Sequence, residues 1–145
     1  MENILQNLNT FLCDINVFYR KLQNYHWNVK GKDFLTIHSK LEEYYNQVNE
    51  KIDEIAEHIL SIGGQPFGTL KDYLENTKIT EAENKKVDST IVLSEIIKDY
   101  SMLLEEAKNI KKLADKNSEY KTSALMDNII EEYTKNLWML KQCIE

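Results

Sequence analysis

Residues that interrupt helices are scarce in this chain. Its 145 residues include only four glycines and one proline, whereas 42% are hydrophobic and 29% are charged. A charge-rich chain with so few helix breakers is typical of long helices joined by few loops, and the length suits one domain with a real core. No stretch reaches the roughly 18 continuous apolar residues that a membrane span needs, so we expect no membrane segment.

Cysteine is equally scarce. Cys13 and Cys143 stand alone, without the Cys-x-x-Cys spacing of metal and redox motifs, and we interpret them as reduced packing residues. The first residues, Met1 to Ile4, lack the basic start and apolar run of a signal peptide. Together these absences lead us to expect a cytoplasmic protein.

Positive charge is the third scarce feature. The chain has 18 Lys and Arg against 24 Asp and Glu, which gives a net charge of −6. Its first 19 residues contain no Lys or Arg, and we find no basic tail at either end. Because an acidic surface repels nucleic acid and attracts cations, we expect metal ions rather than DNA as partners.

Apolar residues at helical spacing are abundant. Steps of three and four residues run from Ile4 to Tyr25 and resume near Phe34, which predicts two helices separated by residues 29–33. Gly63-Gly64-Gln65-Pro66 ends the second helix. The predicted helices span about Ile4–Tyr25, Phe34–Ile62, Leu70–Glu75, Ser89–Asp115 and Thr122–Ile144.

Four of these helices are long, and one long connection, residues 67–88, separates the second from the third. This pattern predicts an all-α fold, a ferritin-like four-helix bundle with a short extra helix in the long crossover. We find no internal repeat, no low-complexity segment and no strand pattern. A single domain is therefore expected over residues 1–145.

Residues able to bind a transition metal are few, and their placement is informative. The chain has three histidines and no Glu-x-x-His motif, which excludes the intrasubunit di-iron site of a four-helix bundle. Candidate ligands lie instead on the second predicted helix: His38, Glu42, Asp53 and Glu57. At about 100° per residue they share one face, at about 0°, 40°, 60° and 100°.

The two ends of this set are too far apart for one ion. His38 and Glu57 are separated by roughly 28 Å along the helix axis, whereas bonds from histidine or carboxylate to a first-row metal are about 2.0–2.2 Å long. If two copies of the helix pack antiparallel about a two-fold axis near Gln47–Val48, the histidine end of one copy meets the carboxylate end of the other. His26 could supply a second imidazole. Such a set suits Fe(II), although Zn²⁺ and Mn²⁺ also bind mixed sites.

Around these residues the sequence resembles the Dps family, the starvation-induced miniferritins. Residues 25–31, Tyr-His-Trp-Asn-Val-Lys-Gly, resemble the family's His-Trp segment, and His38 follows His26 at the family's distance of twelve residues. Residues 52–66 resemble its second signature, an Asp-x-x-x-Glu helix that ends in Gly-Gly-x-Pro. Residues 137–140 resemble the closing helix, so the likeness covers nearly the whole chain.

The resemblance implies a shell of twelve subunits that oxidises Fe(II) and stores it as mineral, which protects against oxidative stress. It implies ferroxidase sites at the two-fold interfaces, where His26 and His38 come from one subunit and Asp53 and Glu57 from its neighbour. Glu42 would lie nearby, as a ligand or as a group that orients one. The oxidant would be hydrogen peroxide, or more slowly dioxygen.

Two positions depart from the family's pattern. His58 stands where the family usually has Arg, and we expect it at an interface or on the surface rather than as a ligand. Ala124 stands where an Asp of the three-fold pore is common, so Glu119 or Asp127 is the candidate for the cation funnel. The basic tails through which many members bind DNA are missing, and Trp138 is expected in the core.

Other interpretations of the same residues remain open. His26 could cap a helix C-terminus, and the charged residues of the second helix could form a solvated face. An iron-inactive cage with a structural or recognition role would assemble without binding iron. A small monomeric bundle that binds a partner would keep a native mass near 17.1 kDa.

Overall fold

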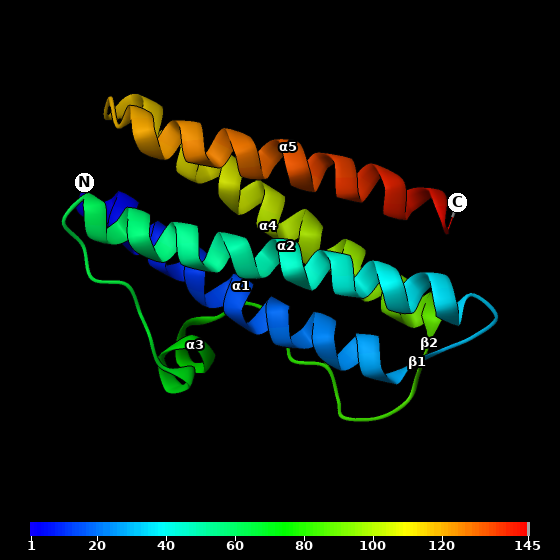
Figure 1. Ribbon diagram of the computed structural model, residues 1–145. Helices are drawn as coiled ribbons and strands as arrows, with labels where there is room; N and C mark the ends of the chain where they lie inside the picture. The colour runs from blue at the N-terminus through cyan, green and yellow to red at the C-terminus, as the bar shows by residue number, and fades with distance from the viewer. Residues whose placement is uncertain (145) are drawn as a thin grey trace.

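A computed structural model describes residues 1–144 as a helical bundle with one long crossover (Figure 1). The all-α prediction is confirmed, and each predicted helix is present with ends shifted by a few residues. Within the described residues the elements are α1 Glu2–Asn28, β1 Val29–Lys30, α2 Phe34–Ser61, α3 Leu70–Asn76, β2 Val87–Asp88, α4 Ser89–Lys116 and α5 Tyr120–Gln142.

The long helices pack as two antiparallel pairs, α1 with α2 and α4 with α5, joined face to face through α1 and α4 (Figure 1). Because the crossover returns the chain to the opposite end, α2 and α4 run parallel. Residues spaced by three and four on each helix are buried, as the periodicity predicts. Full burial of one such aliphatic or aromatic side chain contributes about 1.5–3 kcal/mol.

Aromatic rings fill the centre of the bundle. Tyr100 on α4 meets Phe18, Tyr44 and Tyr133 edge to face, with ring centroids 4.8, 5.5 and 5.0 Å away. Each of the four rings comes from a different long helix, and all are fully buried. Edge-to-face contacts of this kind add stability beyond area burial, so this cluster ties both helical pairs together.

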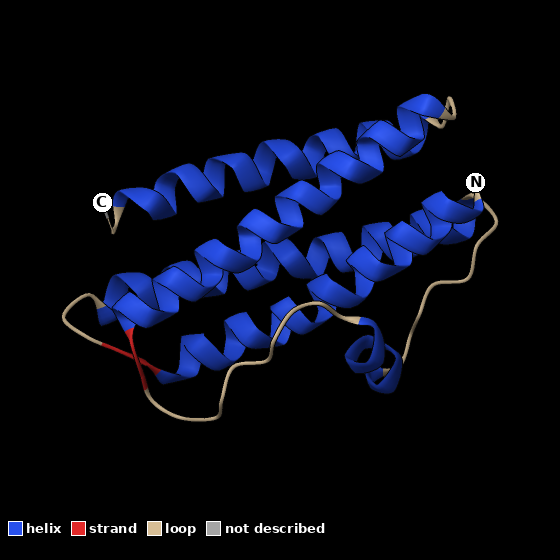
Figure 2. Ribbon diagram, turned by 180° about the vertical axis from the view of Figure 1, so that it is seen from behind, coloured by secondary structure: helices blue, strands red, loops and turns tan. Residues whose placement is uncertain are grey.

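The crossover wraps across the outside of α1 (Figure 2). It leaves α2 at Gly63, which has a φ of +92°, and at Gly64, where a Cβ atom would lie 2.5 Å from Leu5 Cδ2. Glycine is required where the crossover leaves α2, because of both the backbone conformation and the close approach of α1. Farther along the crossover, Thr69 caps α3 by accepting a hydrogen bond of 3.1 Å from the Asp72 amide.

Two short strands close the far end of the crossover. β1 and β2 pair in parallel, with Val29 opposite Val87 and Lys30 opposite Asp88. No sequence pattern predicted these strands, since two residues are too few for an alternating pattern. The pair fastens the α1–α2 loop to the start of α4, which holds the loop that carries the site described below.

The expected core position of Trp138 is wrong, because 62% of this side chain is exposed. Its neighbour Leu137 faces the bundle, and a step of about 100° turns Trp138 outward on α5. Among residues 1–144 no helix is both long enough and apolar enough to cross a membrane.

Candidate metal centre

His26 and His38 lie against each other where α1 ends and α2 begins. The Nδ1 of His26 lies 2.6 Å from the backbone carbonyl of His38, and the Nδ1 of His38 lies 2.7 Å from that of His26. The tight connection between the helices makes this reciprocal pairing possible. It turns at Gly31, with φ +146°, where a Cβ atom would meet Ser89 Oγ at 2.8 Å.

These two hydrogen bonds fix the tautomer of both rings. A carbonyl oxygen only accepts, so each Nδ1 must carry the proton and each neutral ring keeps its lone pair on Nε2. The rings are stacked, with centroids 3.7 Å apart and planes 9° apart. Proteins commonly orient a metal-binding imidazole through a hydrogen bond from its other ring nitrogen to a backbone carbonyl.

Carboxylate and aromatic groups surround the histidine pair. Glu42 Oε1 lies 3.7 Å from the Nε2 of the buried His26, and the ring of Tyr45 meets His26 edge to face at 5.5 Å. Burial raises the pKa of Tyr45, and the charge of Glu42 raises it further. Phe34 stacks on His38 with centroids 4.9 Å apart. Two imidazoles and one carboxylate thus lie near one another as candidate ligands.

Asp53 and Glu57 lie far along α2, on its exposed face, as their spacing predicts. They line an open groove of about 700 Å³ between α2 and α5, together with Glu54, His58 and Lys121 among others. Within residues 1–144 no three His, Cys, Asp or Glu side chains lie close enough to hold a metal ion. Within one subunit the histidine pair and the Asp53–Glu57 pair are therefore two separate groups of candidate ligands.

A buried ammonium group lies between α1 and α4. The ammonium of the buried Lys21 lies 2.8 Å from Asp99 Oδ2 and 3.5 Å from Glu95 Oε2. Burial raises the pKa of Asp99 although the hydrogen bond from Lys21 opposes that shift. A buried ammonium between the helices repels cations, which agrees with the absence of Glu-x-x-His from the sequence.

The expected surface or interface position of His58 is wrong. Only 4% of this residue is exposed, and its Nε2 lies 2.7 Å from Thr122 Oγ1 on α5. Burial lowers the pKa of His58, and the nearby Lys121 lowers it further. His58 lies about 100° from Glu57 around the helix, on the side that α5 covers. Its role is to join α2 to α5 as a neutral ring.

The two candidates for the cation funnel differ in their surroundings. Glu119 directly precedes α5 and is half-buried, whereas Asp127 is exposed on α5. The ammonium of Lys111 on α4 lies 3.1 Å from Asp127 Oδ1, which partly neutralises that carboxylate. Ala124 lies on the same stretch of α5, at the groove that Asp53 and Glu57 line.

Comparison with known proteins agrees with this fold. The ferritin-like domain family matches residues 5–145. DNA protection during starvation protein 2 of Bacillus anthracis is 41% identical over 97% of this chain and 95% of its own length. General stress protein 20U of Bacillus subtilis is 39% identical over 97% of this chain and 96% of its own length.

A crystal structure gives the same result. The Dps protein of Vibrio cholerae O1, described as a member of a broad superfamily of ferritin-like diiron-carboxylate proteins, superposes with a TM-score of 0.95 at 34% identity. The match covers 99% of this chain and 90% of the other. The chain therefore belongs to the ferritin-like domain family and, within it, to the Dps proteins.

Proposed function

We propose that this protein stores iron and is a ferroxidase, and that it assembles its active sites between subunits. The observation that carries the proposal is the reciprocal pairing of His26 and His38, which presents two neutral Nε2 atoms beside Glu42. Histidine and carboxylate with open coordination positions suit redox-active Fe(II). Zn²⁺ and Mn²⁺ would compete for the same donors.

The missing donors lie at the other end of the same helix. Positions 38 and 57, like 42 and 53, are equidistant from the Gln47–Val48 midpoint of α2. A two-fold axis at that midpoint brings Asp53 and Glu57 of the second subunit to the histidine pair of the first, and it creates two equivalent sites per interface. We infer a closed shell of twelve such subunits.

Iron is the substrate at this site. The imidazoles bind Fe(II) through Nε2, and the carboxylates of Asp53 and Glu57 offset its charge. Two Fe(II) ions give one electron each to hydrogen peroxide, whose O–O bond breaks, and two protons complete two water molecules. Because the electrons are delivered as a pair, no hydroxyl radical is released. Dioxygen is the slower alternative oxidant.

The acidic character of the chain supports storage of the product. A net charge of −6 per subunit draws cations toward the shell, and Glu119 or Asp127 is placed to guide them inward at the start of α5. Fe(III) then mineralises inside the shell. The same charge opposes binding to DNA, so protection under oxidative stress, in the cytoplasm, would come from removing iron and peroxide.

The proposal is tested by loading the purified protein with Fe(II) and hydrogen peroxide, followed by size exclusion with light scattering and iron detection. Twelve chains of 17.1 kDa correspond to about 205 kDa, and hundreds of iron atoms should elute with that mass. A shell of that mass without iron would instead indicate a structural or recognition role. A particle of 17.1 kDa would contradict both shell hypotheses.

A further inference from the structure

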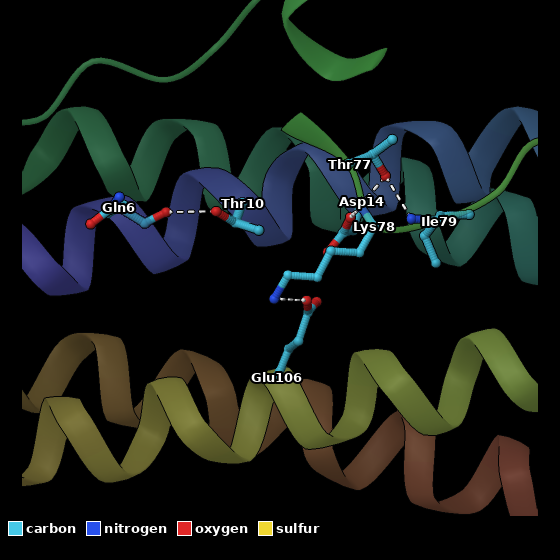
Figure 3. Close-up of polar contacts among 7 residues, drawn as sticks. All are labelled: Gln6, Thr10, Asp14, Thr77, Lys78, Ile79 and Glu106. Carbon is cyan, nitrogen blue, oxygen red and sulfur yellow. Dashed lines mark hydrogen bonds and ion pairs between the residues drawn. The ribbon is translucent and has the colours of Figure 1, made fainter. Parts of the chain in front are cut away.

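A pair of carboxyl groups is buried between α1 and α4 (Figure 3). Asp14 on α1 is fully buried, and the Glu106 side chain on α4 is only 15% exposed. The two side chains are within hydrogen-bonding reach of each other. Asp14 Oδ2 and both carboxyl oxygens of Glu106 are buried, and among the described residues only Glu106 Oε1 has a cationic group beside it, Lys78 Nζ at 3.3 Å.

Two ionised carboxylates cannot be stable in this arrangement. Asp14 Oδ2 and Glu106 Oε2 are buried without a donor among the described residues, and one proton placed between the two groups gives both oxygens a hydrogen bond. Because Asp14 Oδ1 already accepts two hydrogen bonds from the crossover, we place the proton on Glu106, from which it is donated to Asp14 Oδ2.

Asp14 is also the point at which the crossover is attached to the bundle. Its Oδ1 accepts hydrogen bonds from the Thr77 hydroxyl at 2.8 Å and from the Lys78 amide at 2.6 Å. The Thr77 hydroxyl accepts in turn from the Ile79 amide at 3.0 Å, and Ile79 is buried. Residues 77–79 are therefore fastened to α1 through one carboxylate, as Figure 3 shows.

We propose that Asp14 and Glu106 share a single proton and thereby latch the crossover onto the bundle, and that mildly alkaline solution opens this latch by removing the proton. With both groups ionised, their repulsion acts inside the protein, where screening is weak. It pushes Asp14 and the crossover segment that Asp14 holds away from α4. The latch is a property of this subunit and does not depend on iron binding.

The other charged groups nearby do not prevent this opening. Lys78 Nζ lies 3.3 Å from Glu106 Oε1 and would favour its ionised form, but the Lys78 side chain is 62% exposed and its attraction is screened by water. Cys13, beside Asp14, is a neutral thiol, because burial, Asp14 and Asp72 raise its pKa to about 11. Burial first, and Asp14 second, raise the pKa of Glu106 to about 8.

The shared proton can be observed directly by infrared spectroscopy of the whole protein. We expect a carbonyl band of a protonated carboxyl group at neutral pH, which disappears near pH 8 and is absent from E106Q. E105Q is the matched control, because Glu105 is the adjacent residue and is 69% exposed. E105Q should retain the band. In D14N the band should disappear at a lower pH than in wild type. A band equally strong in wild type and E106Q would overturn the proposal.

Hydrogen exchange tests whether the proton holds the crossover. Once intrinsic exchange rates are corrected for, protection of the Lys78 and Ile79 amides in wild type and E105Q should fall by up to about tenfold per pH unit between about pH 4.5 and about pH 8 and level off above that. In E106Q the protection should stay constant with pH, since glutamine cannot ionise. The same decline in E106Q as in wild type, or no decline in either, would contradict the latch.

Discussion

His26 and His38 hold each other's backbone carbonyl through Nδ1, at 2.6 and 2.7 Å, so that the helices α1 and α2 are joined by the two side chains that would bind iron. Because each Nδ1 donates to a carbonyl, both Nε2 atoms keep a lone pair that is available before any metal binds. The two imidazoles are thus preorganised by the α1–α2 turn itself, whereas in the proposed site the carboxylates of Asp53 and Glu57 come from a second subunit.

This division of the site predicts that two inactive variants restore each other. H38A and D53A shells should each lose nearly all Fe(II) oxidation, because each site lacks a ligand. If the two variants are mixed before assembly, one of the two sites at every mixed interface consists of unaltered residues only. About a quarter of the wild-type activity should then return.

The measurement is the initial rate of Fe(II) oxidation in shells refolded from equal amounts of the two variants. The control is the same two proteins assembled separately and mixed afterwards, in which no activity should appear. If mixed shells were as inactive as this control, each site would be built within one subunit, and the two-fold arrangement would be wrong.

Acidification should stop iron oxidation before it dissociates the shell. Protonation of Nε2 removes the lone pairs of His26 and His38, so Fe(II) binding must release protons and must weaken as pH falls. We expect the oxidation rate to drop steeply toward about pH 5 while light scattering shows an unchanged mass. An undiminished rate at that pH would exclude histidine as a ligand.

Gly64 should be intolerant of any side chain. An added Cβ would lie 2.5 Å from Leu5 Cδ2 and 2.9 Å from Ile59 Cγ2, so that both side chains have to move at the start of the crossover. We expect G64A to lower the free energy of unfolding by about 1–3 kcal/mol. G68A serves as the control, because a Cβ there meets nothing within 4 Å. The measurement is denaturant titration. Equal unfolding midpoints for G64A and G68A would contradict this prediction.

The buried acid pair should also be visible in global stability. The folded state raises the pKa of Glu106 from its ordinary 4.5 to about 8, so the folded state binds a proton that the unfolded chain releases in this range. The stability associated with that proton is complete below about pH 4.5 and is lost as pH rises through about 8. E106Q keeps a neutral side chain throughout.

We therefore expect the melting temperatures of wild type and E106Q to be similar below about pH 4.5, to diverge by several degrees as pH rises from about 4.5 to about 8, and to differ by a constant amount above that, with E106Q the more stable. Thermal unfolding followed by circular dichroism over this pH range provides the measurement, with E105Q melting like wild type throughout. A difference of constant size at every pH would show that Glu106 is not protonated in the folded protein.

The sequence alone predicted the long helices, the short helix in the crossover and the bundle with one crossover. These features follow from local information, since apolar spacing, glycine pairs and proline act on neighbouring residues. The division of the candidate ligands also followed from the sequence, because the rise of a helix makes His38 and Glu57 too distant for one ion. That two-fold arrangement of the ligands stays a prediction.

Features that depend on contacts between distant segments could not be predicted. The reciprocal hydrogen bonds of His26 and His38 join residues twelve positions apart through backbone carbonyls, which no side-chain pattern reveals. The short β1–β2 pair has no periodicity to detect. The burial of His58 against Thr122 and the exposure of Trp138 depend on which faces α5 covers.

The pairing of Asp14 with Glu106 shows the same limit most clearly. In sequence each is one acidic residue among 24 on a helix with charged positions, where a solvated side chain is the ordinary expectation. Only the packing of α4 and the crossover against α1 removes water from both carboxyl groups and gives Asp14 its two donors. The sequence thus determined which helices form, whereas the tertiary structure decided which of their charges are buried, because burial depends on neighbours that are distant along the chain.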